Sequence, residues 1–194
     1  MATTLEIPVE PELPDQYELI DGEVVEVQPM GVYSAEVANR LHDELNYYSR
    51  QTRLGRARMD MIFRLPLRQD TNRNRKPDLA FISFMRWPLD RVLPYSGNFA
   101  DAVPELMIEV VSPTDKAEEI LDRAFEYLHA GARLAWIIYP AVRTIHAYTS
   151  RNLSPRAFSE DSILDAGDLL PGFSVPVTVL FPPVTGIPEG KSEE

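Results

Sequence analysis

The sequence of 194 residues contains no cysteine. This absence excludes disulfide scaffolds, thiol nucleophiles, and zinc or iron–sulfur sites built on cysteine ligands. No apolar run reaches the roughly 20 residues that a membrane-spanning helix needs. Residues 1–11 are acidic and rich in proline, unlike the basic start of a signal peptide. We therefore expect a cytoplasmic protein that has no membrane partner.

Positive charge is scarce and unevenly distributed. The chain carries 30 acidic and 19 basic residues, a net charge of −11, and this charge opposes the long-range attraction on which proteins that coat nucleic acid depend. Residues 34–76 nevertheless contain ten Lys and Arg against five Asp and Glu. A face that meets phosphate groups and an ordinary solvated, arginine-rich surface both explain this segment.

The length and the hydrophobic pattern predict one domain over residues 15–181, with mobile proline-containing tails at 1–14 and 182–194. The dipeptide Asp21-Gly22 predicts a tight hairpin between strands at 17–20 and 23–27. Helical spacing predicts helices from Ser34 to about Thr52 and from Thr114 to Gly131, with Ser34 and Thr114 as N-caps. Further strands are predicted at 58–65, 77–82, 106–111, 134–139 and 144–148, and residues 173–181 close the domain. This order predicts an α/β fold in which helices flank a mixed central sheet after an N-terminal hairpin.

Two carboxylates interrupt the apolar strands predicted for the centre of the sheet. Asp78 stands directly before the run 79–82, and Glu109 stands between Ile108 and Val110. Burial of an unpaired carboxylate costs several kcal/mol, so each needs a partner. Mg²⁺ would supply one, because it prefers oxygen ligands. Alternatively, Asp78 caps a turn or pairs with a nearby cation, and Glu109 lies at a solvated strand edge.

Lysine is limited to Lys76, Lys116 and Lys191. A lysine that orients an attacking water must therefore be Lys76 or Lys116, and each lies near an acid in the sequence.

Several motifs follow one another along the chain. They are YELIDGE at 17–23, KPDLAF at 76–81, ELMIEVVSP at 105–113, residues 127–131 followed by Trp136, and LPGF at 170–173. Together they resemble the Uma-type restriction endonuclease family of the PD-(D/E)XK nuclease superfamily, over about residues 15–181. The resemblance implies a restriction-endonuclease-like central sheet.

The resemblance also implies a catalytic site. In it, Asp78 and Glu109 hold Mg²⁺ or Mn²⁺ beside the scissile phosphate, and the backbone of Val110 or Val111 adds a ligand. Water activated by the metal would attack phosphorus without a covalent enzyme intermediate. Nucleic acid, with DNA as the expected form, is the implied substrate. A homodimer is implied as well, because two-fold pairs of sites commonly cleave both strands.

The sequence departs from the superfamily pattern at the position of the motif lysine, two residues after Glu109, where Val111 stands. Family members often place that lysine four residues before the helical tyrosine, a position occupied here by Arg123. Arginine binds phosphate but cannot act as a general base, because its pKa exceeds about 12. Lys116, predicted in the first helical turn, is the other candidate. The histidine usual near the start of the first helix is also missing.

These observations favour a metal-dependent endonuclease with Asp78 and Glu109 as metal ligands and with Lys116 or Arg123 supporting the phosphate or the water. The alternative is a nuclease fold that has lost catalysis and serves as a binding or assembly module, as the valine at 111 and the net charge suggest. A hydrolase of esters or sugars that uses two carboxylates is disfavoured, because no motif of such a site is present.

Overall fold

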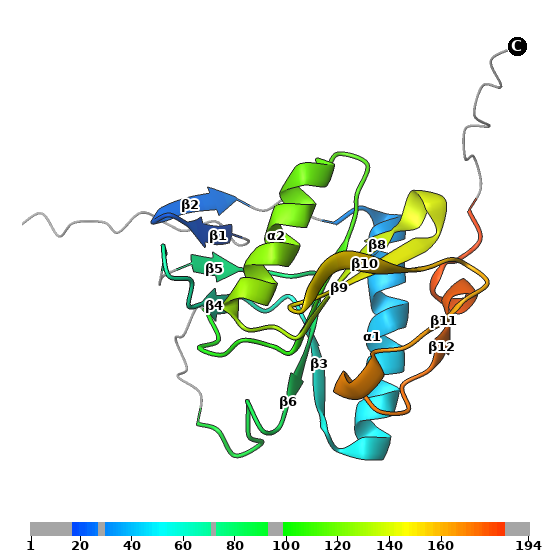
Figure 1. Cartoon of the computed structure of the whole chain (residues 1–194), viewed down its shortest axis with the longest axis horizontal. Helices are drawn as coiled ribbons and strands as arrows, with labels where there is room; N and C mark the ends of the chain where they lie inside the picture. The colour runs from blue at the N-terminus through cyan, green and yellow to red at the C-terminus, as the bar shows by residue number, and fades with distance from the viewer. Residues whose placement is uncertain (1–16, 27–29, 71–72, 93–98, 185–194) are drawn as a thin grey trace, which may run out of the picture.

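The computed structural model describes residues 17–26, 30–70, 73–92 and 99–184 (Figure 1). The predicted tail at 1–14 and most of the tail at 182–194 lie outside these residues. Pro182 is described, and its carbonyl oxygen accepts a hydrogen bond from the Tyr33 hydroxyl at 3.0 Å. Within the described ranges, no helix has the length and apolar character needed to cross a bilayer.

A six-stranded mixed sheet forms the centre of the domain (Figure 1). Its order is β10 (Asn152–Phe158), β9 (Thr144–Thr149), β8 (Leu134–Tyr139), β7 (Leu106–Val110), β6 (Leu79–Ser83) and β3 (Gly55–Met59). Strands β7 and β8 are parallel, whereas the other neighbours are antiparallel. The mixed central sheet predicted from the sequence is therefore confirmed.

Helices α1 (Val32–Thr52) and α2 (Ala117–Ala130) cover opposite faces of this sheet. Alternate residues of β7 separate the two sides: Ile108 packs in the core cluster of α1, whereas Met107 packs with Tyr127 of α2. In Figure 1, α2 lies in front of the sheet and α1 behind it. This alternation follows from the two-residue period of a strand, and it places Glu109 on the α2 side.

The predicted hairpin belongs to a second, four-stranded sheet. The order of this sheet is β2 (Glu23–Glu26), β1 (Tyr17–Ile20), β5 (Arg73–Arg75) and β4 (Phe63–Leu65). Asp21 and Gly22 connect β1 to β2 with φ angles of 50° and 84°, as a primed turn requires. The hairpin prediction is confirmed, and β5 lies between the strands predicted at 58–65 and 77–82.

The single strand predicted over 58–65 is wrong. The chain leaves β3 at Met59, turns at Asp60 with a φ of 52°, and enters the other sheet as β4. Aspartate tolerates this left-handed conformation better than most residues, so the apolar alternation continues through a change of sheet.

The C-terminal part of the domain is more divided than expected. Residues 163–180 form the short pair β11 (Ile163–Leu164) and β12 (Val175–Pro176), with the 3₁₀ turns η2 (Gly167–Leu169) and η3 (Val177–Leu180). A further 3₁₀ turn, η1 (Pro140–Val142), connects β8 to β9.

Both predicted helix N-caps are also wrong. Helix α1 begins after Gly31, and the Ser34 hydroxyl donates to the carbonyl oxygen of Val111 at 3.3 Å. Helix α2 begins after Lys116 because residues 112–115 form a turn of their own, in which Asp115 accepts the Ser112 N–H at 2.7 Å. Gly131 ends α2 with a φ of 112°, as predicted.

Candidate active site

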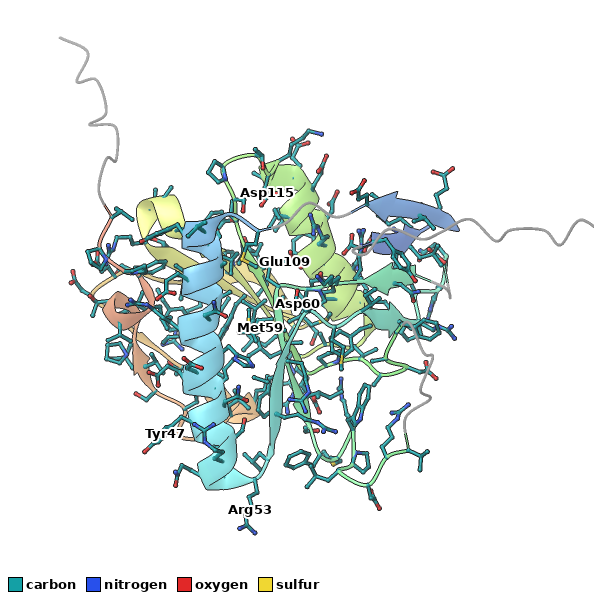
Figure 2. The ribbon with its side chains drawn as sticks, turned by 180° about the vertical axis from the view of Figure 1, so that it is seen from behind. Tyr47, Arg53, Met59, Asp60, Glu109 and Asp115 are labelled. Atoms are coloured by element: carbon teal, nitrogen blue, oxygen red, sulfur yellow. The ribbon has the colours of Figure 1, made fainter. Side chains whose placement is uncertain are left out.

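The register of the central sheet brings Asp78 and Glu109 together. Leu79 of β6 pairs with Ile108 of β7 in an antiparallel ladder, so the next positions, 78 and 109, face each other across the same side of the pair. Asp78 is fixed there because its Oδ2 accepts the Val110 N–H at 2.7 Å. Figure 2 shows Glu109 between α1 and α2.

Glu109 is held by two side chains of α2. The Tyr127 hydroxyl donates to Oε1, and Arg123 lies 3.4 Å from Oε2. Only 3% of Glu109 is exposed, and Tyr127 is fully buried. Tyr127 and Arg123 are four residues apart on the helix, so they project from the same side. The helix therefore orients this carboxylate from above the sheet.

The pKa values of both carboxyl groups are raised, because burial outweighs the positive charge near them. Burial, with the charge of Asp78 as the next cause, raises the pKa of Glu109 from 4.5 to about 8 against the opposing effects of Arg123 and Tyr127. Burial also raises the pKa of Asp78 from 3.8 to about 6, although the Val110 N–H lowers it. Burial therefore favours the protonated form of Glu109, and a further cation would favour the ionised form.

A third buried carboxylate, Glu18 of β1, lies behind this pair. Its Oε2 pairs with Arg75 at 2.7 Å, and its Oε1 accepts the Lys76 N–H at 3.0 Å. Arg75 also pairs with Glu126 of α2 at 2.7 Å. Both oxygens of Glu18 are therefore occupied, and its charge contributes to the raised pKa of Glu109. Glu18 connects the hairpin sheet to the site.

The two lysine candidates are placed very differently. The Lys116 side chain is 78% exposed and pairs with Glu119 at 2.6 Å; it has no contact with Asp78 or Glu109 in the described structure. The Lys76 side chain is only 11% exposed, its Nζ lies 2.8 Å from Oδ1 of Asp60, and its charge lowers the pKa of Asp78. The structure therefore brings Lys76, and not Lys116, to the carboxylate pair.

Two residues of this site, Tyr127 and Glu18, are not predicted from the sequence to contact its charged groups. Tyr127 served only as a landmark for Arg123, although its helical spacing from Arg123 could have shown that both face Glu109. Glu18 lies 57 residues from Arg75 in the chain, and no local pattern predicts such a pairing.

Asp78 and Glu109 suit a hard divalent cation. Their positions oppose one another across β6 and β7, the positive charge nearby does not prevent the rise of both pKa values, and Oδ1 of Asp78 accepts no hydrogen bond from the described residues. Two carboxylates are a common protein contribution to a Mg²⁺ site, with other positions left to water and phosphate. Across the described ranges, no group of three or more His, Cys, Asp or Glu side chains is arranged to hold a metal ion. The candidate centre thus consists of two carboxylates.

Comparisons with known proteins agree with this architecture. Residues 3–178 match the family model of Uma2, described as "Putative restriction endonuclease", whereas no curated protein matches the sequence. A crystal structure described as "a putative nuclease belonging to DUF820", from Anabaena variabilis, is similar with a TM-score of 0.69 and 19% identity. The similarity covers 85% of this chain and 89% of that chain, and it establishes the nuclease-like fold. Because the family match spans most of the sequence, this protein belongs to the Uma2 family.

Proposed function

We propose that the protein is an endonuclease that hydrolyses phosphodiester bonds of DNA and depends on Mg²⁺ or Mn²⁺. The observation that carries this proposal is the buried pair of Asp78 and Glu109 on opposed strand positions, whose pKa values both stay raised despite the positive charge of Arg123. Membership of a family described as "Putative restriction endonuclease" supports nucleic acid as the substrate. We also propose a homodimer, because a two-fold pair of sites would cleave both strands of a duplex.

The residues of the site have separable roles in this proposal. Asp78 and Glu109 would hold the cation, with the backbone of Val110 as an additional ligand. A divalent cation there would polarise the phosphate and stabilise the negative charge that develops on its oxygens. Tyr127 and Arg123 fix the direction of the Glu109 carboxylate through their contacts. Arg123 also supplies positive charge, but it cannot accept a proton from water.

Lys76 supplies the ammonium group that Val111 cannot. Its partner Asp60 is 79% exposed, and an ion pair with such a partner contributes little to stability. A phosphate could therefore replace Asp60 as the partner of Lys76 at low cost. In this role, Lys76 would steady the phosphate next to Asp78.

The test is a cleavage assay on plasmid and single-stranded DNA with Mg²⁺, with Mn²⁺ or with chelator. We expect cleavage only with metal, its loss in Asp78→Asn, and a decrease of about 10²-fold or more in Lys76→Met, since removal of one charge-stabilising group commonly has this effect. Lys116→Met is the matched control and should cleave like the wild type. Cleavage that persists in Asp78→Asn would disprove the proposed metal role.

Absence of cleavage by the wild-type protein would favour the alternative, a nuclease fold that has lost catalysis and acts as a binding or assembly module. The valine at position 111 is the observation behind this alternative. Sedimentation of the same samples tests the proposed dimer, which a purely monomeric protein would contradict.

A further inference from the structure

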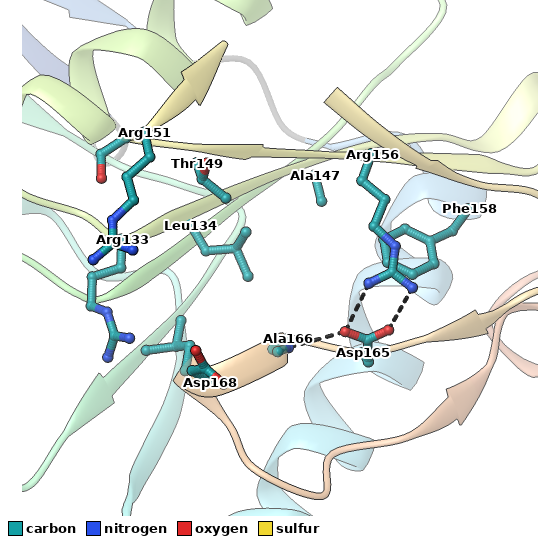
Figure 3. A pocket seen from close by; sticks show the side chains of 13 residues that line it. Arg133, Leu134, Ala147, Thr149, Arg151, Arg156, Phe158, Asp165, Ala166 and Asp168 are labelled. Atoms are coloured by element: carbon teal, nitrogen blue, oxygen red, sulfur yellow. Dashed lines mark hydrogen bonds and ion pairs between the residues drawn. The ribbon is translucent and has the colours of Figure 1, made fainter. Parts of the chain in front are cut away.

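A hollow of about 400 Å³ lies on the side of the central sheet remote from the carboxylate pair (Figure 3). One of its lining residues is Leu134, the first residue of β8. Leu134 pairs with the first residue of the parallel strand β7, whereas Glu109 lies near the end of β7. Leu134 and Ala147 also belong to the core on the α1 face, whereas Glu109 contacts α2. The hollow therefore lies on the opposite face of the sheet from the candidate active site and near the opposite ends of β7 and β8.

On one wall of this hollow, an arginine and an aspartate neutralise each other. Arg156 forms two contacts with Asp165, at 3.0 and 2.8 Å, and its guanidinium lies 4.4 Å from the centre of the Phe158 ring. The Gly167 N–H donates to the same carboxylate at 3.0 Å. This arginine is thus held in place by a carboxylate and an aromatic ring.

The opposite wall carries positive charge without a partner. Arg133 and Arg151 are exposed, and neither side chain has a hydrogen bond or ion pair with any residue in the described ranges. Figure 3 shows both side chains on the same side of the hollow, with Asp168 below Arg133. Three arginines and two aspartates line the hollow, so it is locally positive in a chain whose net charge is −11.

We infer that this hollow binds a nucleotide through its phosphate group. A phosphate monoester carries a charge of about −1.5 to −2 at neutral pH, and two guanidinium groups match it better than they match a single carboxylate. The apolar residues Leu134, Ala147 and Leu169 give the base an apolar surface, and Asp168 can accept hydrogen bonds from sugar hydroxyls. The volume lies within the range of about 300–1,000 Å³ that is usual for small-molecule pockets.

Calorimetric titration with adenosine 5′-monophosphate tests this inference in the presence of chelator, which removes divalent cations from the carboxylate pair. We expect saturable binding with one site per chain, weaker binding of inorganic phosphate, and none of adenosine. The double variant Arg133→Gln/Arg151→Gln should lose at least tenfold in affinity. Its thermal unfolding should be unchanged, because neither side chain forms a hydrogen bond or an ion pair with the described residues.

Two control variants separate this site from others. Arg50→Gln removes an exposed arginine of α1 outside the hollow, and Asp78→Asn alters the candidate active site; both should bind the nucleotide like the wild type. The inference does not depend on cleavage, so failure of the nuclease assay leaves it standing. Equal affinity of the double variant and the wild type, or no saturable binding at millimolar nucleotide, would overturn it.

The phosphate could belong to a free nucleotide or to the end of a nucleic-acid strand. A 5′-phosphorylated tetranucleotide distinguishes these sources. Tighter binding of the tetranucleotide than of the mononucleotide would assign the site to strand ends, and the reverse order would assign it to free nucleotides. Both orders support the phosphate site, provided that a tetranucleotide with a 5′-hydroxyl binds more weakly.

Discussion

Replacement of Glu109 by glutamine should stabilise the protein at alkaline pH in the absence of divalent cations. The folded protein holds the Glu109 carboxyl protonated up to a pKa of about 8, compared with an ordinary value of 4.5. Glutamine closely resembles the protonated acid in shape, and its amide oxygen can still accept the hydrogen bond from the Tyr127 hydroxyl. The variant therefore removes the ionisation of Glu109 while retaining most of its contacts.

The sign and the size of this effect follow from proton linkage. Between pH 4.5 and 8, the folded wild type binds more protons at Glu109 than the unfolded chain does, so its free energy of unfolding decreases as the pH rises. Each tenfold change in the ionisation constant corresponds to about 1.4 kcal/mol. The difference between Glu109→Gln and the wild type should thus be near zero below pH 4.5 and approach about 4–5 kcal/mol above pH 8.

Urea unfolding at a series of pH values, with chelator present, measures this difference directly. Glu119→Gln is the matched control: Glu119 is exposed, and its pKa is lowered by the hydrogen bond from Lys116, so its difference from the wild type should stay constant above pH 5. A difference for Glu109→Gln that is also constant between pH 5 and 9, or that decreases with pH, would refute the argument.

The same samples also test cation binding. A ligand that binds only the folded state stabilises it by about 2.7 kcal/mol at 100 times its dissociation constant. Saturating Mg²⁺ or Mn²⁺ should raise the unfolding free energy of the wild type near pH 8 and leave that of Glu109→Gln almost unchanged. Equal stabilisation of both proteins would place the cation elsewhere.

Three further substitutions test individual contacts. Tyr127→Phe removes the hydroxyl that donates to Glu109, so the pKa of Glu109 should rise further; a carbon-13 titration that shows no rise would contradict this. Arg75→Met leaves Glu18 buried without its ion pair, which should lower the unfolding free energy by about 3–5 kcal/mol; a loss below about 1 kcal/mol would show that the pair contributes little. Gly55→Ala places a Cβ atom 2.4 Å from the carbonyl oxygen of residue 82 and should cost about 1–3 kcal/mol, and unchanged denaturant unfolding would show that this strand edge yields easily.

The sequence predicts those parts of the fold that depend on local chemistry. Asp21 and Gly22 determine the first turn by themselves, and Gly131 ends α2 for the same reason, a positive φ angle. The starts of the helices were missed by two to three residues, because turn contacts around Asp115 delay α2 and Gly31 rather than Ser34 begins α1. A side chain that could cap a helix can form its hydrogen bond with another nearby group instead, and the sequence does not show which partner it takes.

Features that depend on contacts between distant parts of the chain are harder to predict from the sequence. The apolar alternation through Met59 and Phe63 gives no sign that the chain changes sheets at Asp60. For the site, the cost of burial singles out Asp78 and Glu109 as candidates, since a carboxylate in an apolar strand needs a partner. Which lysine lies beside them depends on how two sheets pack, so sequence spacing alone does not distinguish Lys76 from Lys116.

The charges around the carboxylate pair determine what the loss of the motif lysine means. Arg75 is engaged by Glu18 and Glu126, and Lys76 by Asp60. Within the described structure, this leaves Arg123, at 3.4 Å from Glu109, as the cation in contact with the pair. A lysine at position 111 would have reduced the excess negative charge, and valine does not. Valine in place of the motif lysine should therefore weaken catalysis without weakening cation binding. A protein without activity would still bind Mg²⁺. Cleavage assays, and not metal affinity, therefore distinguish the endonuclease from the alternative that has lost catalysis.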